Sequence, residues 1–354
     1  MIDKKNDFRF REELPSRIEM ESCVQQWTQQ LTPLLEAEER SISQRISLSD
    51  EVTYWKNRCQ DLENIFEQLK EKVVRQMATT LEEIGSAQSA TFKTLLRRVV
   101  AGLVEAQEIA LHLKPIVKPL EGLEVPEVGE MVQPLRLLLH TVSLVWCTCS
   151  YFRQPIKLAY LLRQVGNALI ERCRIYLDAR SIFTWEIEES IEKTTASLMI
   201  FTHLRQFYYE ERENVHSLTQ RLRESGRCNV TFSGTEAKEL WNPPLEIVFD
   251  KVSAFEKRLN AIISIFYLIQ EFSRLSRVEL SAMGGRSLTT QVQNICQQFC
   301  EMKAPMISGA FGDCMDPDNQ QFETAVVEFL DDVKRLEEKI ISIVGNLRSY
   351  QILT

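Results

Sequence analysis

Apolar residues recur at alternating steps of three and four in three long segments of the chain. This spacing places them on one stripe of an α-helix, so each segment predicts an amphipathic helix that buries one face. The stripe of the first segment consists of Val52, Trp55, Cys59, Leu62, Phe66, Leu69 and Val73. That of the second consists of Val252, Phe255, Leu259, Ile262, Phe266 and Ile269. The third and most regular stripe consists of Phe322, Val326, Phe329, Val333, Leu336, Ile340, Ile343 and Leu347.

Residues typical of helix starts precede each segment. Ser47 and Asp50 have the spacing of a capping box, in which each side chain bonds the backbone N–H of the other residue. The Pro243–Pro244 pair stops any helix that arrives from upstream of the second segment. Asp316 is the expected N-cap of the third helix, with Pro317 at its first position, where a missing N–H costs nothing.

The apolar stripes indicate how these helices pack. Each stripe spans about two to four heptads, the lower limit for a coiled coil. Helices that pack on one another within one chain fit this length better than a long parallel dimer does. No stretch alternates strictly between apolar and polar residues, so we expect little sheet. The expected fold class is all-α, an elongated stack of helical bundles with short heptad-patterned helices.

Prolines and glycines interrupt the helical pattern twice. Residues 114–134 hold four prolines and two glycines, and residues 225–244 hold two of each. Both stretches are predicted to be irregular connectors. They divide the chain into an N-terminal helical block (1–113), a middle block (135–224) and a C-terminal block (245–354).

Residues 137–152 are the best candidate for a membrane span, because they contain no Asp, Glu, Lys or Arg. A spanning helix needs about 20 apolar residues. This stretch is shorter, and it also carries His140 and several hydroxyl side chains. We therefore expect a helix that is buried on most sides inside a bundle.

The composition of the 354-residue chain fits a folded helical protein. Hydrophobic residues make up 44% and charged residues 26%, which is enough for a core. Glycine and proline number only 12 and 11, which disfavours a turn-rich all-β fold. The net charge of −8 argues against a nucleic-acid partner. Nine scattered cysteines without a CxxC pair, and a start without an apolar signal, indicate reduced, mostly buried thiols in the cytosol.

Motifs of nucleotide, metal and hydrolase sites are absent from the sequence. It contains no GxxxxGK[ST], GxGxxG, HExxH or GxSxG. Cys296 and Cys300 could share a helix face, and Cys147 and Cys149 are two positions apart. Two thiols do not complete a zinc shell, so core packing is the expected role of both pairs. The four histidines are also isolated: His112, His140, His203 and His216.

Two further groups of residues have simple structural explanations. Asp313, Asp316 and Asp318 lack the glycine and the closing glutamate of a calcium loop, so helix capping is expected. Four aromatic residues are expected to pack between helices, because no basic groove accompanies them: Tyr208, Tyr209, Trp241 and Phe266. We therefore assign no catalytic, cofactor-binding or metal-ligating residue, and we expect no cofactor.

Three blocks of the sequence hold ordered sets of aromatic, apolar and charged residues. The first set is Glu51, Trp55, Arg58, Leu62, Ile65, Gln68 and Leu69. The second is Trp146, Tyr151, Phe152, Leu161, Leu162, Arg163, Asn167, Ile170 and Cys173. The third is Phe255, Arg258, Leu259, Phe266, Glu271, Phe272, Leu275, Val278 and Glu279. In this order the blocks resemble the N-terminal tail (stem) of dynein heavy chains, over about residues 45–350, and the resemblance favours the axonemal type over the cytoplasmic type.

The resemblance implies a non-catalytic role. In this family the tail associates heavy chains, carries intermediate and light chains, and anchors a minus-end-directed microtubule motor to cargo or to the ciliary axoneme. The ATPase ring lies downstream, so we expect no enzymatic activity from this chain and no direct contact with microtubules. Expected locations are the cytoplasm, the cytoskeleton and the axoneme of a cilium or flagellum. Neither nucleic acid nor a membrane is an expected partner.

Two alternatives remain open at the level of the sequence. A helical adaptor or tethering rod unrelated to motors fits the amphipathic helices equally well, although it predicts a helical repeat of one length that we do not find. An enzyme with an unrecognised helical active site is the other alternative. Turnover of ATP by the purified chain would reveal it.

Overall fold

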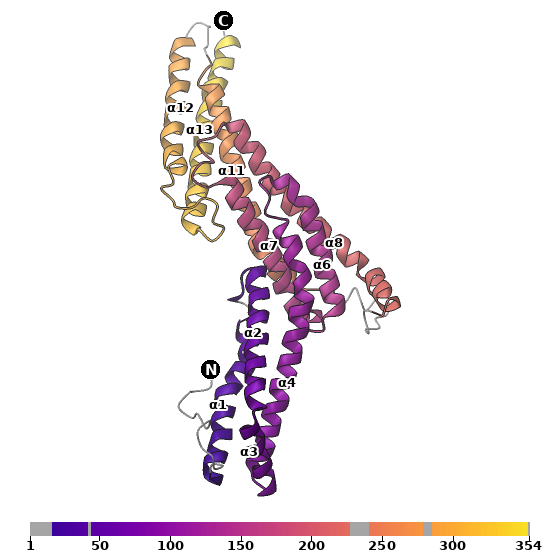
Figure 1. Cartoon of the computed structure of the whole chain (residues 1–354). Helices are drawn as coiled ribbons and strands as arrows, with labels where there is room; N and C mark the ends of the chain where they lie inside the picture. Colours follow the sequence, from indigo (N-terminus) through magenta and orange to yellow (C-terminus); the bar gives the residue numbers. More distant parts are fainter. Residues whose placement is uncertain (1–15, 42–43, 227–240, 279–284, 353–354) are drawn as a thin grey trace. The chain divides into compact units, whose positions relative to one another are not determined.

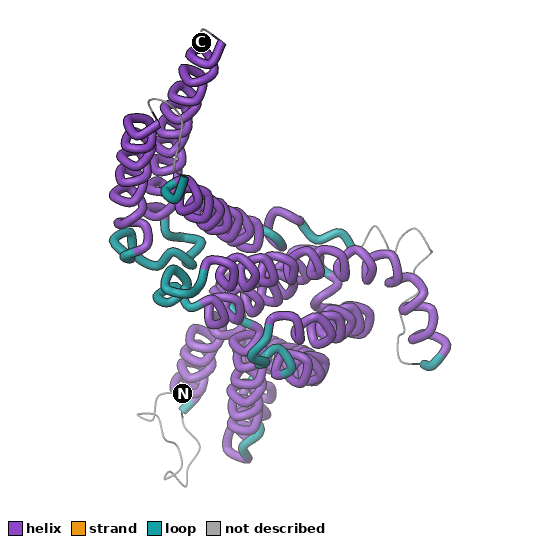
Figure 2. The backbone as a smooth tube through the Cα atoms, turned by 90° about the horizontal axis from the view of Figure 1, so that it is seen from above, coloured by secondary structure: helices purple, strands orange, loops and turns teal. Residues whose placement is uncertain are grey.

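The computed structural model describes residues 16–41, 44–226, 241–278 and 285–352, which form two compact units. Unit 1 combines residues up to 121 with 137–165 and 211–244, and unit 2 combines 122–136, 166–210 and 245–354. Every regular element in the described ranges is a helix (Figures 1 and 2). The all-α prediction is therefore confirmed.

Unit 1 contains four helices from the start of the chain, and α4 packs most extensively, above all against α2 and α1 (Figure 1). It also contains the short helix η6 and parts of three later helices. The four are α1 (Arg17–Ser41), α2 (Leu48–Leu69), α3 (Lys72–Glu83) and α4 (Ala87–Leu113). The others are α6 (Val132–Thr148), η6 (Tyr151–Arg153), α7 (Pro155–Leu177) and α8 (Ile187–Glu224).

The first predicted helix corresponds to α2, and its start is as expected. Ser47 Oγ accepts a hydrogen bond from the Asp50 N–H at 3.0 Å, and the Asp50 carboxylate accepts one from the Ser47 N–H at 3.0 Å. The prediction that Val73 continues the buried stripe is wrong. The helix ends at Leu69, and Glu71 has an extended ψ of 144° before α3 begins. The helical register is lost at this break, and Val73 is 41% exposed.

The apolar stretch 137–152 lies largely in α6 and in the core of unit 1. Most of its large side chains are buried, as predicted for a helix inside a bundle, although Leu137 is exposed. The buried apolar residues of this stretch are Leu138, Leu139, Val142, Val145, Trp146, Cys147, Cys149, Tyr151 and Phe152. Across the ranges with assigned structure, no helix is both long and apolar enough to cross a membrane.

Unit 2 is built around α11 (Asp250–Leu275), α12 (Gly285–Ile307) and α13 (Gln320–Ile352). Helix α12 contacts both of the others, and its Phe299 stacks on Phe272 of α11 with ring centroids 4.1 Å apart. The tight packing of α7 on α11 depends on Gly166. A Cβ at that position would lie 2.7 Å from Val252 Cγ2, so a larger residue would push the two helices apart.

The predicted stripes of α11 and α13 agree with the structure over most of their length. Five of the six predicted residues of α11 are buried, and Ile269 is half-buried. On α13 the stripe is buried from Phe322 to Leu336, whereas Ile340 and Ile343 are half-buried. The side chain of Leu347 lies outside the described residues, and so does Glu279 of the third resemblance block. The stripes therefore serve packing within one chain.

The predicted start of α13 is wrong by three residues. Asp316 does not cap a helix, because its carboxylate accepts a hydrogen bond from the Asp318 N–H in a turn. Asn319 caps α13 instead, and its Oδ1 accepts a hydrogen bond from the Phe322 N–H at 3.1 Å. The Asn319 Nδ2 group donates to the Phe311 and Asp313 carbonyls, so this side chain fixes the turn as well as the helix.

The two expected connectors differ in how far the structure describes them. Residues 114–134 hold the short helices η4 (Lys114–Ile116), α5 (Val117–Glu121) and η5 (Val128–Met131) and the first turn of α6. Most of 225–244 lies outside the described residues, and the short helix α10 (Leu245–Val248) begins directly after Pro244. The division of the chain into three blocks remains a prediction of the sequence.

Candidate functional site

The histidines and acidic residues are dispersed. His140 lies 3.2 Å from the Glu211 carboxylate, His112 lies 3.1 Å from Thr148 Oγ1, and His203 stacks on Phe207. Within the described residues no group of three or more His, Cys, Asp or Glu side chains could hold a metal ion. In the described ranges these histidines therefore take part in helix packing and in surface contacts.

Six of the eight cysteines in the described ranges are buried, and Cys228 lies outside those ranges. Core packing is confirmed for Cys147, Cys149 and Cys296. The same expectation is wrong for Cys300, which is exposed. Phe299 takes the buried position instead, because neighbouring residues of a helix are about 100° apart around its axis.

Burial suppresses the reactivity of several of these thiols. It raises the pKa of Cys149 to about 11 and the pKa of Cys173 to about 12. The pKa of Cys314 also rises to about 12, through burial and the nearby Asp313 carboxylate. Since the thiolate is the nucleophilic form, these cysteines are packing residues.

The aspartates before α13 act in a turn and in ion pairs, so their expected role as helix caps is wrong. The Asp313 carboxylate accepts a hydrogen bond from the Met315 N–H and pairs with Arg174 at 2.8 Å. Asp318 pairs with Lys251 at 2.8 Å. These contacts anchor the turn to α7 and α11.

The aromatic residues follow the prediction with one exception. Tyr208, Trp241 and Phe266 are buried, and Trp241 packs edge-on against Trp146 with ring centroids 5.4 Å apart. Tyr209 is 45% exposed, so the prediction of a packing role for it is wrong. As with Cys300, the side chain next to a core residue points away from the core.

A buried polar cluster in unit 1 gathers residues of the first resemblance block. The Glu51 carboxylate accepts hydrogen bonds from Trp55 Nε1 at 2.8 Å, Arg45 Nη1 at 3.2 Å and Gln164 Nε2 at 3.1 Å. The Arg45 guanidinium also lies over the Tyr54 ring, 4.2 Å from its centroid. A buried charge is costly unless it is paired and hydrogen-bonded, and here both charges are. The cluster ties α7 to the start of α2.

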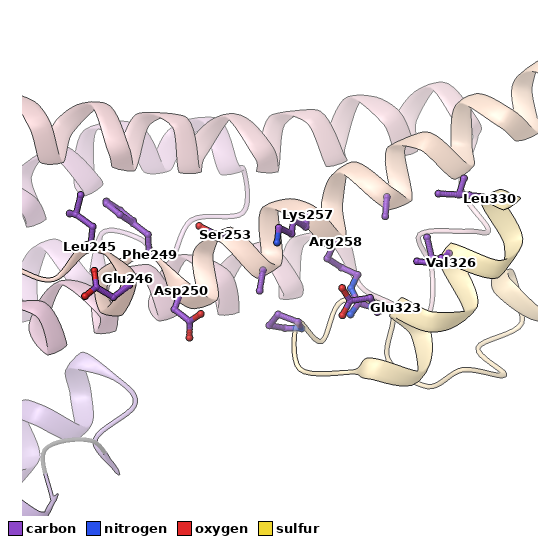
Figure 3. Close-up of a pocket in the computed structure, with 14 residues that line it drawn as sticks. Leu245, Glu246, Phe249, Asp250, Ser253, Lys257, Arg258, Glu323, Val326 and Leu330 are labelled. Carbon is purple, nitrogen blue, oxygen red and sulfur yellow. The ribbon is translucent and has the colours of Figure 1, made fainter.

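A groove of about 550 Å³ opens within unit 2 (Figure 3). One wall is formed by α10 and α11 between Leu245 and Ala261, and the other by the start of α13 between Pro317 and Leu330. Apolar side chains such as Val326 lie beside acidic and basic ones along this groove. A mixed lining of this kind suits an amphipathic partner better than a uniformly apolar ligand.

Arg258 is the most unusual side chain of the groove. It is only 5% exposed, its Nη2 donates to the Asn319 carbonyl at 2.9 Å, and its guanidinium lies 4.9 Å from the Phe322 ring centroid. Its Nη1 is buried and has no hydrogen-bond partner among the described residues. Burial lowers the pKa of Arg258, but an arginine remains charged at neutral pH. The groove is therefore lined by a buried positive charge that forms no ion pair in the described part of the chain.

The fold and these sites define an all-α protein made of helical bundles, with its potentially reactive side chains mostly in packing positions. Within that class the chain belongs to the dynein heavy chain family, because residues 18–346 match the region described as dynein heavy chain, N-terminal region 1. The resemblance found in the three sequence blocks is thereby confirmed. The alternative of an adaptor or tethering rod unrelated to motors is contradicted.

Ciliary and axonemal dynein chains are among the most similar relatives. The chain is 32% identical over 93% of its length to a ciliary dynein beta chain of Heliocidaris crassispina. It is 32% identical over 92% of its length to human dynein axonemal heavy chain 9, and 24% identical over 92% to the beta chain of the flagellar outer arm of Chlamydomonas reinhardtii. The chain spans about 7% of the length of each of these relatives. The matched part is the N-terminal region, and the motor region is not covered.

The cluster and the groove are not apparent from the sequence. Glu51 and Arg258 stand out there only as points of resemblance, and Trp55 also as a residue of the first apolar stripe. Their spacing gives no sign that Glu51 meets Gln164 of another helix or that Arg258 is buried beside an opening. The one available signal is that Arg258 lies three residues after Phe255 and directly before Leu259, at the edge of a face that normally holds apolar residues.

Proposed function

We propose that this chain is a non-catalytic part of the tail of an axonemal dynein heavy chain. It acts as a scaffold for heavy-chain association and for the binding of intermediate and light chains in a minus-end-directed ciliary motor complex. Its connection to microtubules is indirect, through the rest of the complex. The cytoskeleton of the cilium or flagellum is its place of action.

The match of residues 18–346 to the N-terminal region of the family is the observation that carries this proposal. The packing supports it. Motif residues such as Trp55, Trp146 and Phe255 are fully buried, so they maintain the bundles and leave the exposed helix faces available to partners. The ciliary and axonemal names of the relatives support the assignment to an axonemal dynein.

Affinity isolation from ciliated cells tests the proposal. The tagged chain is expressed, and co-purified dynein intermediate and light chains are quantified by mass spectrometry. We expect clear enrichment over an unrelated helical protein of similar length and net charge. The variant Phe329→Asp, which disrupts the packing of unit 2, should lose the partners that bind that unit. Equal recovery of intermediate chains with the unrelated protein would overturn the proposal.

An enzymatic role is the second candidate, and no specific observation favours it. Hydrolysis of ATP by the purified chain, above the rate of a buffer control, would contradict a purely structural role.

A further inference from the structure

The groove of unit 2 is lined by basic groups that form no ion pair with a described residue. They are Arg258, whose buried Nη1 has no hydrogen-bond partner in the described ranges, and Lys257. Three carboxylates of the chain act on Arg258 from a longer range and raise its pKa: Glu323, Asp316 and Asp313. Glu323 is exposed, so water screens most of its effect. A guanidinium without an ion pair in its own chain can gain charge-assisted hydrogen bonds from the carboxylate of a partner.

The opposite end of the groove has the reverse charge. Glu246 and Asp250 are exposed there, four residues apart, and neither pairs with a basic group in the described part of the chain (Figure 3). Lys257 and Arg258 follow at the positive end. At 1.5 Å per helical residue, Asp250 and Arg258 are separated by about 12 Å along α11. An occupant must therefore carry an acidic and a basic group about two helical turns apart.

The shape of the groove fits a helix. Both walls are helix surfaces, and the lining residues of α11 recur at steps of three and four from Asp250 to Ala261, a length of about 16 Å. Apolar contacts come from Val326 and Val327 of α13, and Val327 is 56% exposed although it lies between buried turns. A third helix laid along these two would bury that surface by the helix-in-groove mode.

We propose that this groove binds an amphipathic helix of a partner chain, which places a carboxylate against Arg258 and Lys257 and a basic side chain against Glu246 and Asp250. The inference rests on the proposed scaffold function and names the chemistry of one of its partners. Charge complementarity sets the direction of the bound helix, and the apolar face supplies most of the buried area.

Photo-crosslinking in the assembled motor complex identifies the occupant. Val327 of the full-length heavy chain is replaced by a photo-crosslinking phenylalanine derivative, and the crosslinked peptide is mapped by mass spectrometry. We expect one segment with apolar residues at steps of three and four, an Asp or Glu within one turn of the crosslink, and a Lys or Arg about two turns away. A segment without a carboxylate, or no crosslink to another chain, would overturn the inference.

Charge reversal provides the quantitative test. Lys257→Glu changes an exposed side chain that holds no contact of the fold, and it should reduce the crosslinking yield about tenfold or more. Reversing the charge of the mapped partner carboxylate should restore the yield in the double variant. The matched control is Lys334→Glu, an exposed position of α13 outside the groove, and it should leave the yield unchanged. Equal yields for Lys257→Glu and Lys334→Glu would contradict the inference.

The two proposals fail in different ways. If intermediate and light chains co-purify normally while the crosslink is absent or insensitive to Lys257→Glu, only the groove assignment is wrong. If the wild-type chain recovers no dynein subunits, the scaffold function itself is wrong. Arg258→Met serves as a second variant in the crosslinking assay. Circular dichroism before that assay establishes that the variant is folded.

Discussion

Among the described residues each unit buries one arginine, and the two arginines have different surroundings. Arg45 of unit 1 is 7% exposed, and its charge is balanced by the buried Glu51 carboxylate at 3.2 Å. Arg258 of unit 2 is 5% exposed, and its Nη2 donates a hydrogen bond to a neutral carbonyl, that of Asn319. Arg45 is thus enclosed by its own unit, whereas Arg258 lines an open groove.

The difference separates a structural polar group from a recognition group. A buried ion pair holds two elements in one arrangement, and removal of either partner leaves an uncompensated charge. A buried cation without an ion pair in its own chain can contribute to binding, because a partner can supply the carboxylate that pairs with it. The two arginines therefore predict opposite responses to substitution.

The largest effect is expected in the core of unit 2, beside the groove. Phe329→Asp places an unpaired charge among Phe299 and its neighbours and should reduce the free energy of unfolding by about 5 kcal/mol. Chemical denaturation followed by circular dichroism measures it. Asp332→Ala, a half-buried position one turn away that faces off the stripe, should be nearly neutral. Equal stability of the two variants would show that the stripe of α13 is not buried.

Loss of the ion pair in unit 1 should have the next largest effect. Glu51→Ala leaves Arg45 buried without a carboxylate and should reduce the free energy of unfolding by about 3–4 kcal/mol. Tryptophan fluorescence is a suitable probe, because Trp55 lies in the cluster. The control Glu63→Ala removes an exposed carboxylate from the same helix. A loss below 1 kcal/mol for Glu51→Ala would contradict the structural role of the pair.

Cysteine reactivity compares exposed and buried positions within unit 2. At pH 8 Cys300 should be alkylated at least about a hundredfold faster than Cys314, equivalent to about 3 kcal/mol of protection. Burial raises the pKa of Cys314 to about 12, so its thiolate forms only when the pH approaches that value or the fold opens. Peptide mass spectrometry of a time course measures both rates. Similar rates would mean that unit 2 opens readily.

The smallest effect on stability is expected for Arg258, and it completes the comparison. Arg258→Met removes the hydrogen bond to Asn319 but also removes a buried charge that forms no ion pair with a described residue. The two contributions oppose each other, so the free energy of unfolding should change by about 1 kcal/mol or less. The same denaturation assay measures it. A loss as large as that of Glu51→Ala would show that Arg258 is structural and would weaken the case for a partner carboxylate.

Several features of the fold were predictable from local rules. The capping box at Ser47 follows from a three-residue spacing, and the buried faces of α11 and α13 follow from helical periodicity. The errors at Val73 and Asp316 have a shared cause. A break between helices depends on turn geometry, here the extended Glu71 and the side-chain bonds of Asn319, and hydrophobic spacing does not report it.

The candidate site was not predictable in the same way. Cys300 and Tyr209 are next to core residues in the sequence, and only the rotation of each helix against its neighbours shows that they are exposed. The hydrogen bond from Gln164 to Glu51 joins residues that are 113 positions apart. No local pattern encodes such a contact.

The amino-acid order determined by itself that this chain is helical, most of the buried stripes of α11 and α13 and which family it belongs to, because these properties depend on residues within a few turns of one another or on their order along the chain. The tertiary structure alone decided which charges are compensated. Whether an arginine meets a carboxylate depends on how distant helices are packed, and that packing leaves Arg45 paired and Arg258 with an open donor.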